Sequence, residues 1–259
     1  MKNYTPDISL VCPLHDPEAR LAKATRTYGK DLKRLYFGHI HIRATKDTHP
    51  DSLKALDSAN ITYSIEKNSG KYIAMGKTYK EALNMGIKMK TRNIHVCDFD
   101  RILHWVKNYS SELKDIIEFL PSNQGITWLG RTSRAFNTHP KTQKETEEIV
   151  NILASEVANQ KVDIMSGSFA LDLASAKLLL KKSKRNDYSF FAEFIKLAKE
   201  NNIQINSLMT EGLEWETPDQ YEDKIQKEGY SDWLDEFMSL PEWKRRIELM
   251  EKNTEVLLS

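Results

Sequence analysis

Asp98 and Asp100 stand one residue apart at the end of a short apolar run, Ile94 to Cys97. Side chains two residues apart in a strand point to the same face. Two carboxylates held that close repel each other unless a cation lies between them or one is protonated. Because Mg²⁺ and Mn²⁺ prefer oxygen ligands and bind phosphates, the spacing predicts a Mg²⁺ or Mn²⁺ site that also holds a substrate diphosphate. The alternative is an exposed acidic turn.

A second set of candidate residues lies in the polar stretch from Gly130 to Pro140. Arg131 and Arg134 carry planar guanidinium groups suited to phosphate or carboxylate. Together with His139 they predict recognition of an anionic group on a donor or an acceptor. The alternative is that both arginines pair at the protein surface with acids of the following segment, namely Glu145, Glu147 or Glu148.

Strand and helix patterns alternate through the first hundred residues. Strands are predicted at 8–12, 36–42, 61–65 and 94–97, and helices at 18–35, 51–57 and 73–89. Such alternation is typical of a mostly parallel sheet flanked by helices, in which ligands bind at the carboxyl ends of the strands. One crevice is therefore expected to collect the residues that follow strand ends, namely His15, Arg43, Asp98 and Asp100.

The second half of the chain is more helical. Helices are predicted at 105–120, 141–159, 169–181 and 190–200, strands at 125–129 and 203–208, and a polar loop at 130–140. The tail from Pro218 is acidic, aromatic and predicted to be helical. We expect one α/β domain over residues 1–216, with a helical C-terminal extension over residues 217–259 packed on it.

Composition excludes several classes of protein. The 259 residues include 38 Lys and Arg against 37 Asp and Glu, so we expect no bulk attraction to nucleic acid or membrane. The two cysteines, Cys12 and Cys97, lie in apolar runs and are predicted to be reduced core residues, which suits the cytoplasm. Neither an apolar leader nor a membrane-spanning stretch is evident. The sequence leaves the oligomeric state open.

Five different short segments follow one another along the chain in a characteristic order. They are the strand Ile8–Pro13, N-S-G at Asn68–Gly70, A-L-N-M-G-I at Ala82–Ile87, I-H-V-C-D-F-D at Ile94–Asp100, and the small-residue stretch Met165–Phe169. An acid at the start of a predicted helix, Asp187, follows them. Over residues 7 to 216 this order resembles the family-2-like glycosyltransferases of the GT-A fold, as a divergent branch.

The resemblance implies transfer of a sugar from a nucleotide-diphosphate-sugar donor to an acceptor hydroxyl. Asp100 would bind the metal directly, and Asp98 would lie nearer the ribose or the ion. A divalent ion bridging the diphosphate oxygens stabilises the charge that grows on this leaving group. Asp187 would be the general base that deprotonates the acceptor.

Other residues receive roles from the same resemblance. Pro13 would open the nucleotide-binding crevice, and His15 and Lys71 would contact the nucleotide or its phosphates. Arg43 ends the second strand, where the family usually carries an acid that contacts the base. Trp215 would close the acceptor side.

Three alternatives remain. A nucleotidyltransferase would share the crevice and the metal-binding acids, but would carry a glycine-rich, basic loop after the first strand, and Cys12–Pro17 has no glycine. A phosphatase or phosphotransferase of the D-x-D type would place its nucleophilic aspartate early in the chain. A non-catalytic GT-A-like domain would bind a sugar nucleotide or a partner protein without turnover.

Overall fold

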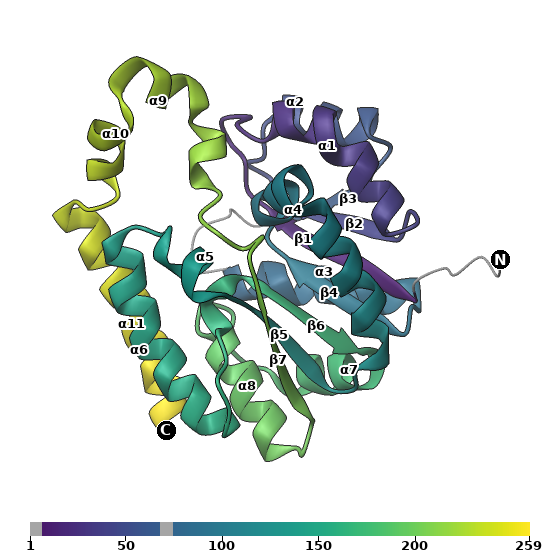
Figure 1. The fold of residues 1–259 in the computed structure, drawn as a ribbon. Helices are drawn as coiled ribbons and strands as arrows, with labels where there is room; N and C mark the ends of the chain where they lie inside the picture. Colours follow the sequence, from purple (N-terminus) through teal and green to yellow (C-terminus); the bar gives the residue numbers. More distant parts are fainter. Residues whose placement is uncertain (1–6, 68–74) are drawn as a thin grey trace.

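A seven-stranded sheet forms the centre of the computed structural model, which describes residues 7–67 and 75–259. Its strands lie in the order β3-β2-β1-β4-β6-β5-β7 (Figure 1). Their bounds are β1 (Ile8–Leu14), β2 (Ile40–Ala44), β3 (Thr62–Ile65), β4 (Asn93–Cys97), β5 (Ile126–Arg131), β6 (Ser168–Asp172) and β7 (Ile205–Thr210). Neighbouring strands of this sheet run parallel, except that β6 runs antiparallel to β4 and β5.

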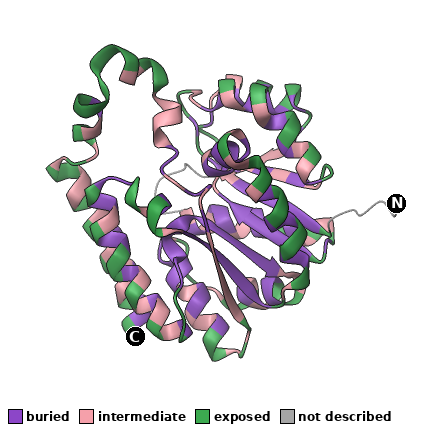
Figure 2. Ribbon diagram, viewed as in Figure 1, coloured by how far each residue is buried: buried purple, intermediate pink, exposed green. Residues whose placement is uncertain are grey.

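Helices cover both faces of this sheet (Figure 1). One apolar layer packs α1 (Ala22–Leu35), α2 (Pro50–Ser58) and α4 (Phe99–Phe119) on the sheet. The other packs α3 (Met75–Met89), α6 (Lys141–Ala158), α7 (Leu173–Lys182), α8 (Phe190–Glu200) and α11 (Leu240–Leu258). The strands between the layers are almost continuously buried, apart from the two edges (Figure 2). The predicted fold class, a mostly parallel α/β sheet flanked by helices with a helical C-terminal part, is confirmed.

The segment from Phe169 to Lys181 was predicted to be one helix, and this prediction is wrong for its first part. Ser168–Asp172 forms β6, and α7 begins only at Leu173. Phe169, Ala170 and Leu171 pair with β4 on one side and β5 on the other, and all three are buried. From sequence alone, a buried strand cannot be distinguished from a buried helix in a short apolar run that is followed by further small and apolar residues.

The connection from β1 to α1 also differs from its prediction. β1 continues through Pro13 to Leu14, because its pairing with β4 ends at Val11 and no N–H is required of Pro13 on that side. Helix α1 starts at Ala22 rather than at Glu18. The Asp16 side chain accepts hydrogen bonds from the backbone N–H of Arg20 at 2.8 Å and of Leu21 at 3.0 Å, and these bonds fix the turn.

The polar loop predicted at 130–140 contains a short helix, α5 (Ser133–Asn137). The Thr132 hydroxyl caps it by accepting from the N–H of Ala135 at 3.1 Å, as expected of a threonine at this position.

The C-terminal residues complete the fold. α11 packs against α6 and α8, and Leu249, Val256 and Leu257 belong to the same apolar layer as the sheet. Between β7 and α11, the chain passes through η4 (Thr217–Gln220), α9 (Glu222–Glu228) and α10 (Tyr230–Glu236). The helices α9 and α10 project from the body and are largely exposed (Figures 1 and 2). The predicted boundary between residues 216 and 217 stays a prediction. In the described ranges, we find no helix with the length and apolarity that crossing a membrane requires.

Candidate functional site

Asp98 and Asp100 lie where β4 ends and α4 begins. The backbone of Asp98 is still extended, whereas Asp100 occupies the first turn of the helix. The two acids are therefore brought together by the change from strand to helix, and not by alternation within a strand. The start of a helix carries a partial positive charge, which favours carboxylates there.

The Asp98 carboxylate has several partners. It accepts a hydrogen bond from the Tyr79 hydroxyl, and Arg101 Nε lies 3.3 Å from its Oδ2. Its backbone N–H donates to the Gly167 carbonyl at 3.2 Å. Gly167 has φ of +69°, and a Cβ at this residue would collide with the Asp98 carboxylate. The small-residue turn after η3 (Ile164–Ser166) therefore serves close packing against Asp98.

Asp100 lies in an acidic environment. Its Oδ2 accepts from Gln220 Nε2 at 3.0 Å and its Oδ1 from the backbone N–H of Arg101 at 2.9 Å. Burial, and next the negative charges of Glu216 and Asp98, raise the pKa of Asp100 to about 7. Burial also raises the pKa of Asp98, although Arg101 and the Tyr79 hydroxyl oppose this.

Arg101 and Glu216 also belong to this cluster of charged side chains around Asp98 and Asp100, and neither was predicted. Both are buried, with exposed fractions of 8% and 6%. Arg101 Nη1 and Glu216 Oε2 lack a hydrogen-bond partner within the described residues. Buried polar atoms are normally paired, so unpaired ones in a native fold call for an explanation such as an absent ligand. Glu216 ends the segment E-G-L-E-W-E, of which only Trp215 was singled out from the sequence.

Helix α4 also fixes the segment that carries Glu216. The Glu112 carboxylate accepts from the backbone N–H of Glu211 at 2.7 Å, from that of Gly212 at 2.9 Å, and from Trp105 Nε1 at 2.8 Å. One helix therefore supplies Asp100 at its start and anchors the chain leading to Glu216 at its middle.

A cavity of about 290 Å³ lies beside Asp100. It is bounded by α1, α4 and the segment from Glu216 to Glu222, and Asp100 and Glu216 both line it. His104 lines it too, with Nδ1 2.7 Å from Asp219 Oδ2 and Nε2 3.2 Å from Glu214 Oε1. Burial disfavours the charged imidazole, but these two carboxylates raise the pKa of His104 above its usual value.

The residues predicted to contact the donor lie along the neighbouring strands. Pro13 in β1 is paired in register with Arg43 in β2. Arg43 Nη2 lies 2.6 Å from Glu81 Oε2, and its Nη1 donates to the Ser64 hydroxyl at 3.0 Å. The exposed His15 has its Nδ1 2.9 Å from the Thr45 hydroxyl. The Arg43 side chain is thus paired with Glu81, whereas the His15 side chain faces solvent.

Lys71 and the N-S-G motif at residues 68–70 lie outside the described residues. Their predicted roles toward a phosphate or a nucleotide stay predictions.

Asp187, predicted to be the general base, lies in the turn before α8 and bonds to Ser189, the N-cap residue of that helix. Its Oδ1 accepts from the N–H of Ser189 at 3.1 Å and from the Ser189 hydroxyl at 2.6 Å. Its carbonyl group lies where a side chain on Gly76 would collide, so this loop packs directly on the start of α3. These contacts give Asp187 a structural role, and its role as a base stays a prediction.

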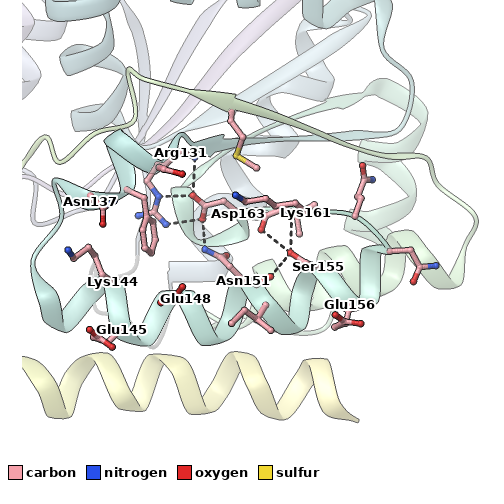
Figure 3. A pocket seen from close by; sticks show the side chains of 17 residues that line it. Arg131, Asn137, Lys144, Glu145, Glu148, Asn151, Ser155, Glu156, Lys161 and Asp163 are labelled. Atoms are coloured by element: carbon pink, nitrogen blue, oxygen red, sulfur yellow. Dashed lines mark hydrogen bonds and ion pairs between the residues drawn. The ribbon is translucent and has the colours of Figure 1, made fainter.

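Arg131, predicted to bind an anion, belongs to a buried ionic network. Its Nη2 lies 2.7 Å from Glu147 Oε2, and its Nε lies 2.7 Å from Asp163 Oδ2. It lines a second cavity of about 720 Å³ along α6, where Asn151 also donates to Asp163 (Figure 3). The pairing with Glu147 was the alternative considered, except that it is buried and not at the surface.

Arg134, His139 and Trp215 lie on the same side of the molecule. Arg134 is half exposed and pairs with Glu211 and Glu214. Burial and the nearby positive charge of Arg131 hold the pKa of His139 well below its usual value, so its imidazole is neutral at physiological pH. Trp215 is buried and stacks on Trp233 at a ring distance of 5.2 Å. No contact among these residues forms a shared anion pocket, and their predicted role stays untested.

The acidic cluster fits a divalent ion in part. In the described portion of the chain, no three His, Cys, Asp or Glu side chains converge as a complete ligand set. Mg²⁺, however, is usually held by one or two carboxylates, with waters and substrate phosphates supplying the other ligands. Asp98 and Asp100 match that smaller requirement, and the raised pKa of Asp100 marks a carboxylate that a cation would stabilise.

Comparison with known proteins gives a likeness of fold. No family model matches the chain, and no curated protein matches it in sequence. Among solved structures it is similar to a cytidylyltransferase from Leptospira borgpetersenii serovar Hardjo-bovis (strain JB197). That similarity has a TM-score of 0.50 and 11% sequence identity, and it covers 97% of this chain and 96% of the other. The two chains share their α/β architecture from end to end.

Proposed function

We propose that this chain is a metal-dependent transferase that binds the diphosphate of a nucleotide beside Asp98 and Asp100. The observation that carries the proposal is the buried cluster at the end of β4, in which Asp100 has a pKa of about 7 and Glu216 has an unpaired oxygen. Asp98 and Asp100 would hold Mg²⁺ or Mn²⁺, which neutralises the leaving diphosphate. The cluster lies at the carboxyl edge of the parallel strands, where such sheets bind ligands.

Sugar transfer from a nucleotide-diphosphate-sugar is the first candidate reaction. It needs a metal on the diphosphate and a site for an acceptor hydroxyl, and Asp100 lies in the first turn after β4 and lines the 290 Å³ cavity. The loop between β1 and α1 supports this choice. It has no glycine, and Asp16 closes it by bonding Arg20, Leu21 and the Ser52 hydroxyl, the last at 2.7 Å.

Nucleotidyl transfer is the second candidate, and the likeness to a cytidylyltransferase favours it. In that reaction a substrate oxygen attacks the α-phosphorus of a nucleoside triphosphate, and pyrophosphate leaves. It would use the same metal at the same two aspartates. The two reactions differ in the bond that breaks, so their products separate them.

The experiment has two stages. Thermal unfolding is first followed with UDP-, GDP- and CMP-sugars and with CTP, each with Mn²⁺ or with EDTA. We expect Mn²⁺-dependent stabilisation by one nucleotide, since a ligand that binds only the folded state raises its stability. Products of the stabilising nucleotide are then separated: a nucleoside diphosphate (or, from a CMP-sugar, CMP) indicates sugar transfer, and pyrophosphate indicates nucleotidyl transfer. Absence of any metal-dependent shift would contradict the proposal.

A further inference from the structure

Charged side chains are unevenly distributed over the molecule, although their total number is balanced. Residues 211–259 contain 14 acidic and 6 basic residues. Residues 173–185, which include α7, contain five basic residues and no acidic one. Residues 75–92, which include α3, contain five basic residues and one acidic residue, Glu81. One part of the surface is therefore basic and another part is acidic.

We propose that the outer side of α3 and α7 docks on the surface of an anionic lipid bilayer. The contact is made by six lysine side chains, here called the basic face: Lys77, Lys80, Lys88, Lys177, Lys181 and Lys184. Such docking goes beyond the proposed reaction and does not depend on it. Because it is a surface contact, it needs no membrane-spanning segment.

The helical spacing of these lysines places them on the outer side of their helices. Lys77 and Lys88 lie eleven residues apart, which is close to three turns, and Lys177 and Lys181 lie about one turn apart. The opposite side of each helix carries its buried residues, which pack in the apolar layer on the sheet. Since α3 and α7 contact each other in that layer, the two rows of lysines lie side by side.

Acidic residues of the same fold neutralise the basic face only slightly. All six lysine side chains are at least partly exposed. Among the described residues, Lys77 alone of the six lies within ion-pair distance of an acid, with its Nζ 3.9 Å from Glu81 Oε1. Glu81 is also 2.6 Å from Arg43, which lies inside the fold. The basic face therefore keeps a net positive charge that a partner would meet.

The residue types around the basic face favour lipid over nucleic acid. Proteins that bind single strands stack the bases on exposed aromatic rings, whereas the one aromatic residue of the two segments, Tyr79, is 1% exposed. Eight of the ten basic residues in these segments are lysines, which act as point charges and not as planar forks. Met85 and Leu180 lie half-buried beside them. Lysine stems that cover such apolar surface leave their ammonium groups free for lipid headgroups.

The acidic part of the chain lies away from the basic face. α11 packs against α6 and α8, and it stands on the opposite side of the molecule from α7 (Figure 1). A negatively charged bilayer attracts one side and repels the other, so the charge distribution orients the molecule. Each lysine close to such a bilayer strengthens binding by about fivefold, and the attraction fades beyond a Debye length of about 8 Å. Lysines on two neighbouring helices are close enough to act together.

Co-sedimentation of the full chain with lipid vesicles tests this docking. The vesicles consist of phosphatidylcholine alone or of phosphatidylcholine mixed with phosphatidylserine, in about 0.1 M KCl, where the Debye length is about 10 Å. We expect binding only to the vesicles that contain phosphatidylserine. We also expect release in about 1 M KCl, where the Debye length falls to about 3 Å.

Lys177→Gln/Lys181→Gln removes two charges from the basic face. Both side chains are exposed and have no ion pair within the described ranges, so the melting temperature should stay that of the wild type. We expect the partition coefficient onto phosphatidylserine vesicles to fall by about tenfold or more. Arg26→Gln/Lys30→Gln is the matched control, since it removes two exposed charges at the same spacing from α1, on the other face of the sheet. Its partition coefficient should stay within about twofold of the wild type.

A second double variant tests whether both helices take part. Lys77→Gln/Lys88→Gln changes α3 and leaves α7 intact, and we expect a loss of the same size as in Lys177→Gln/Lys181→Gln. Full binding by either double variant would overturn the docking of α3 and α7 together.

Three further results would overturn the proposal. The first is absence of wild-type binding to phosphatidylserine vesicles. The second is an equal loss in the Arg26→Gln/Lys30→Gln control, which would mean that net charge and not the basic face decides binding. The third is tighter binding to single-stranded RNA than to the vesicles at the same salt concentration, which would make this face a nucleic-acid surface. None of these results bears on the proposed transfer reaction, which metal-dependent nucleotide binding tests separately.

Discussion

At the scale of single residues, Asp100 differs most from an ordinary member of its type. Burial and the charges of Glu216 and Asp98 raise its pKa to about 7. The folded protein therefore binds more protons than the unfolded chain between about pH 4 and pH 7. In the absence of metal, the free energy of unfolding should fall as the pH rises through 7.

Asp100→Asn tests this dependence, because asparagine is uncharged at every pH. Without metal, we expect the variant to melt about 2–4 °C above the wild type at pH 8, and by a smaller margin at pH 5, because the wild type loses stability progressively between about pH 4 and pH 7. Calorimetric or fluorescence melting over this pH range measures the difference. An equal gain at both pH values would show that Asp100 does not carry the raised pKa.

Arg131 and Arg134 lie three residues apart and were predicted to share one role. Their surroundings differ, since the Arg131 side chain is fully buried between Glu147 and Asp163, whereas the Arg134 side chain is 49% exposed. Removing one partner of a buried ion pair leaves an uncompensated charge, while an exposed pair contributes little.

We expect Arg131→Gln to lower the free energy of unfolding by about 3–5 kcal/mol, and Arg134→Gln by about 1 kcal/mol or less. Urea unfolding of the two variants gives both values. Similar small losses would mean that the Arg131 network does not stabilise the fold and would restore it as a candidate ligand-binding residue.

At the scale of elements, β4 and α4 place the acids. His95 in the middle of β4 is fully buried, with Nδ1 2.6 Å from the Tyr36 hydroxyl and Nε2 2.9 Å from the Ser168 hydroxyl. It therefore links β4 to the end of α1 and to β6. Burial lowers the pKa of His95 to about 3, so the ring is neutral in the folded protein.

His95→Ala should lower the free energy of unfolding by about 2–4 kcal/mol at pH 7.5, through a cavity and two unpaired hydroxyl groups. The wild type should also lose stability as the pH falls below about 6.5, because only the unfolded chain then protonates this histidine. Urea unfolding at pH 7.5 and pH 5 measures both effects. The loss in the variant should be smaller at pH 5, and a loss independent of pH would contradict the neutral ring.

Sequence patterns predicted these elements well where periodicity was strong. The order of strands and helices up to β4 and the helix Phe190–Glu200 followed from local signals. β6 was missed because an apolar run fits either a strand or a helix, and only pairing with β4 and β5 decides. Glu216 was missed because it lies more than a hundred residues from Asp100 along the chain. Only the tertiary structure brings the two residues together.

At the scale of the whole molecule, the C-terminal helix is part of the single body that supports the site. α11 joins the apolar layer formed by α3, α6, α7 and α8 under the sheet. The segment between β7 and α11 carries Glu216 and closes one side of the cavity of about 290 Å³. Arg20 of the opposite wall lies over the Tyr221 ring at 4.1 Å and ties the two walls together. The end-to-end likeness to a cytidylyltransferase agrees with one continuous architecture.

The central claim is that Asp98 and Asp100 hold a divalent ion together with a nucleotide diphosphate. Calorimetric titration of wild type, Asp98→Asn and Asp100→Asn with the stabilising nucleotide, with Mn²⁺ or with EDTA, tests it most directly. We expect wild-type binding only with Mn²⁺, and an affinity at least about tenfold lower in each variant, equivalent to about 1.4 kcal/mol. Equal affinities in all three proteins, or binding that persists in EDTA, would contradict the account.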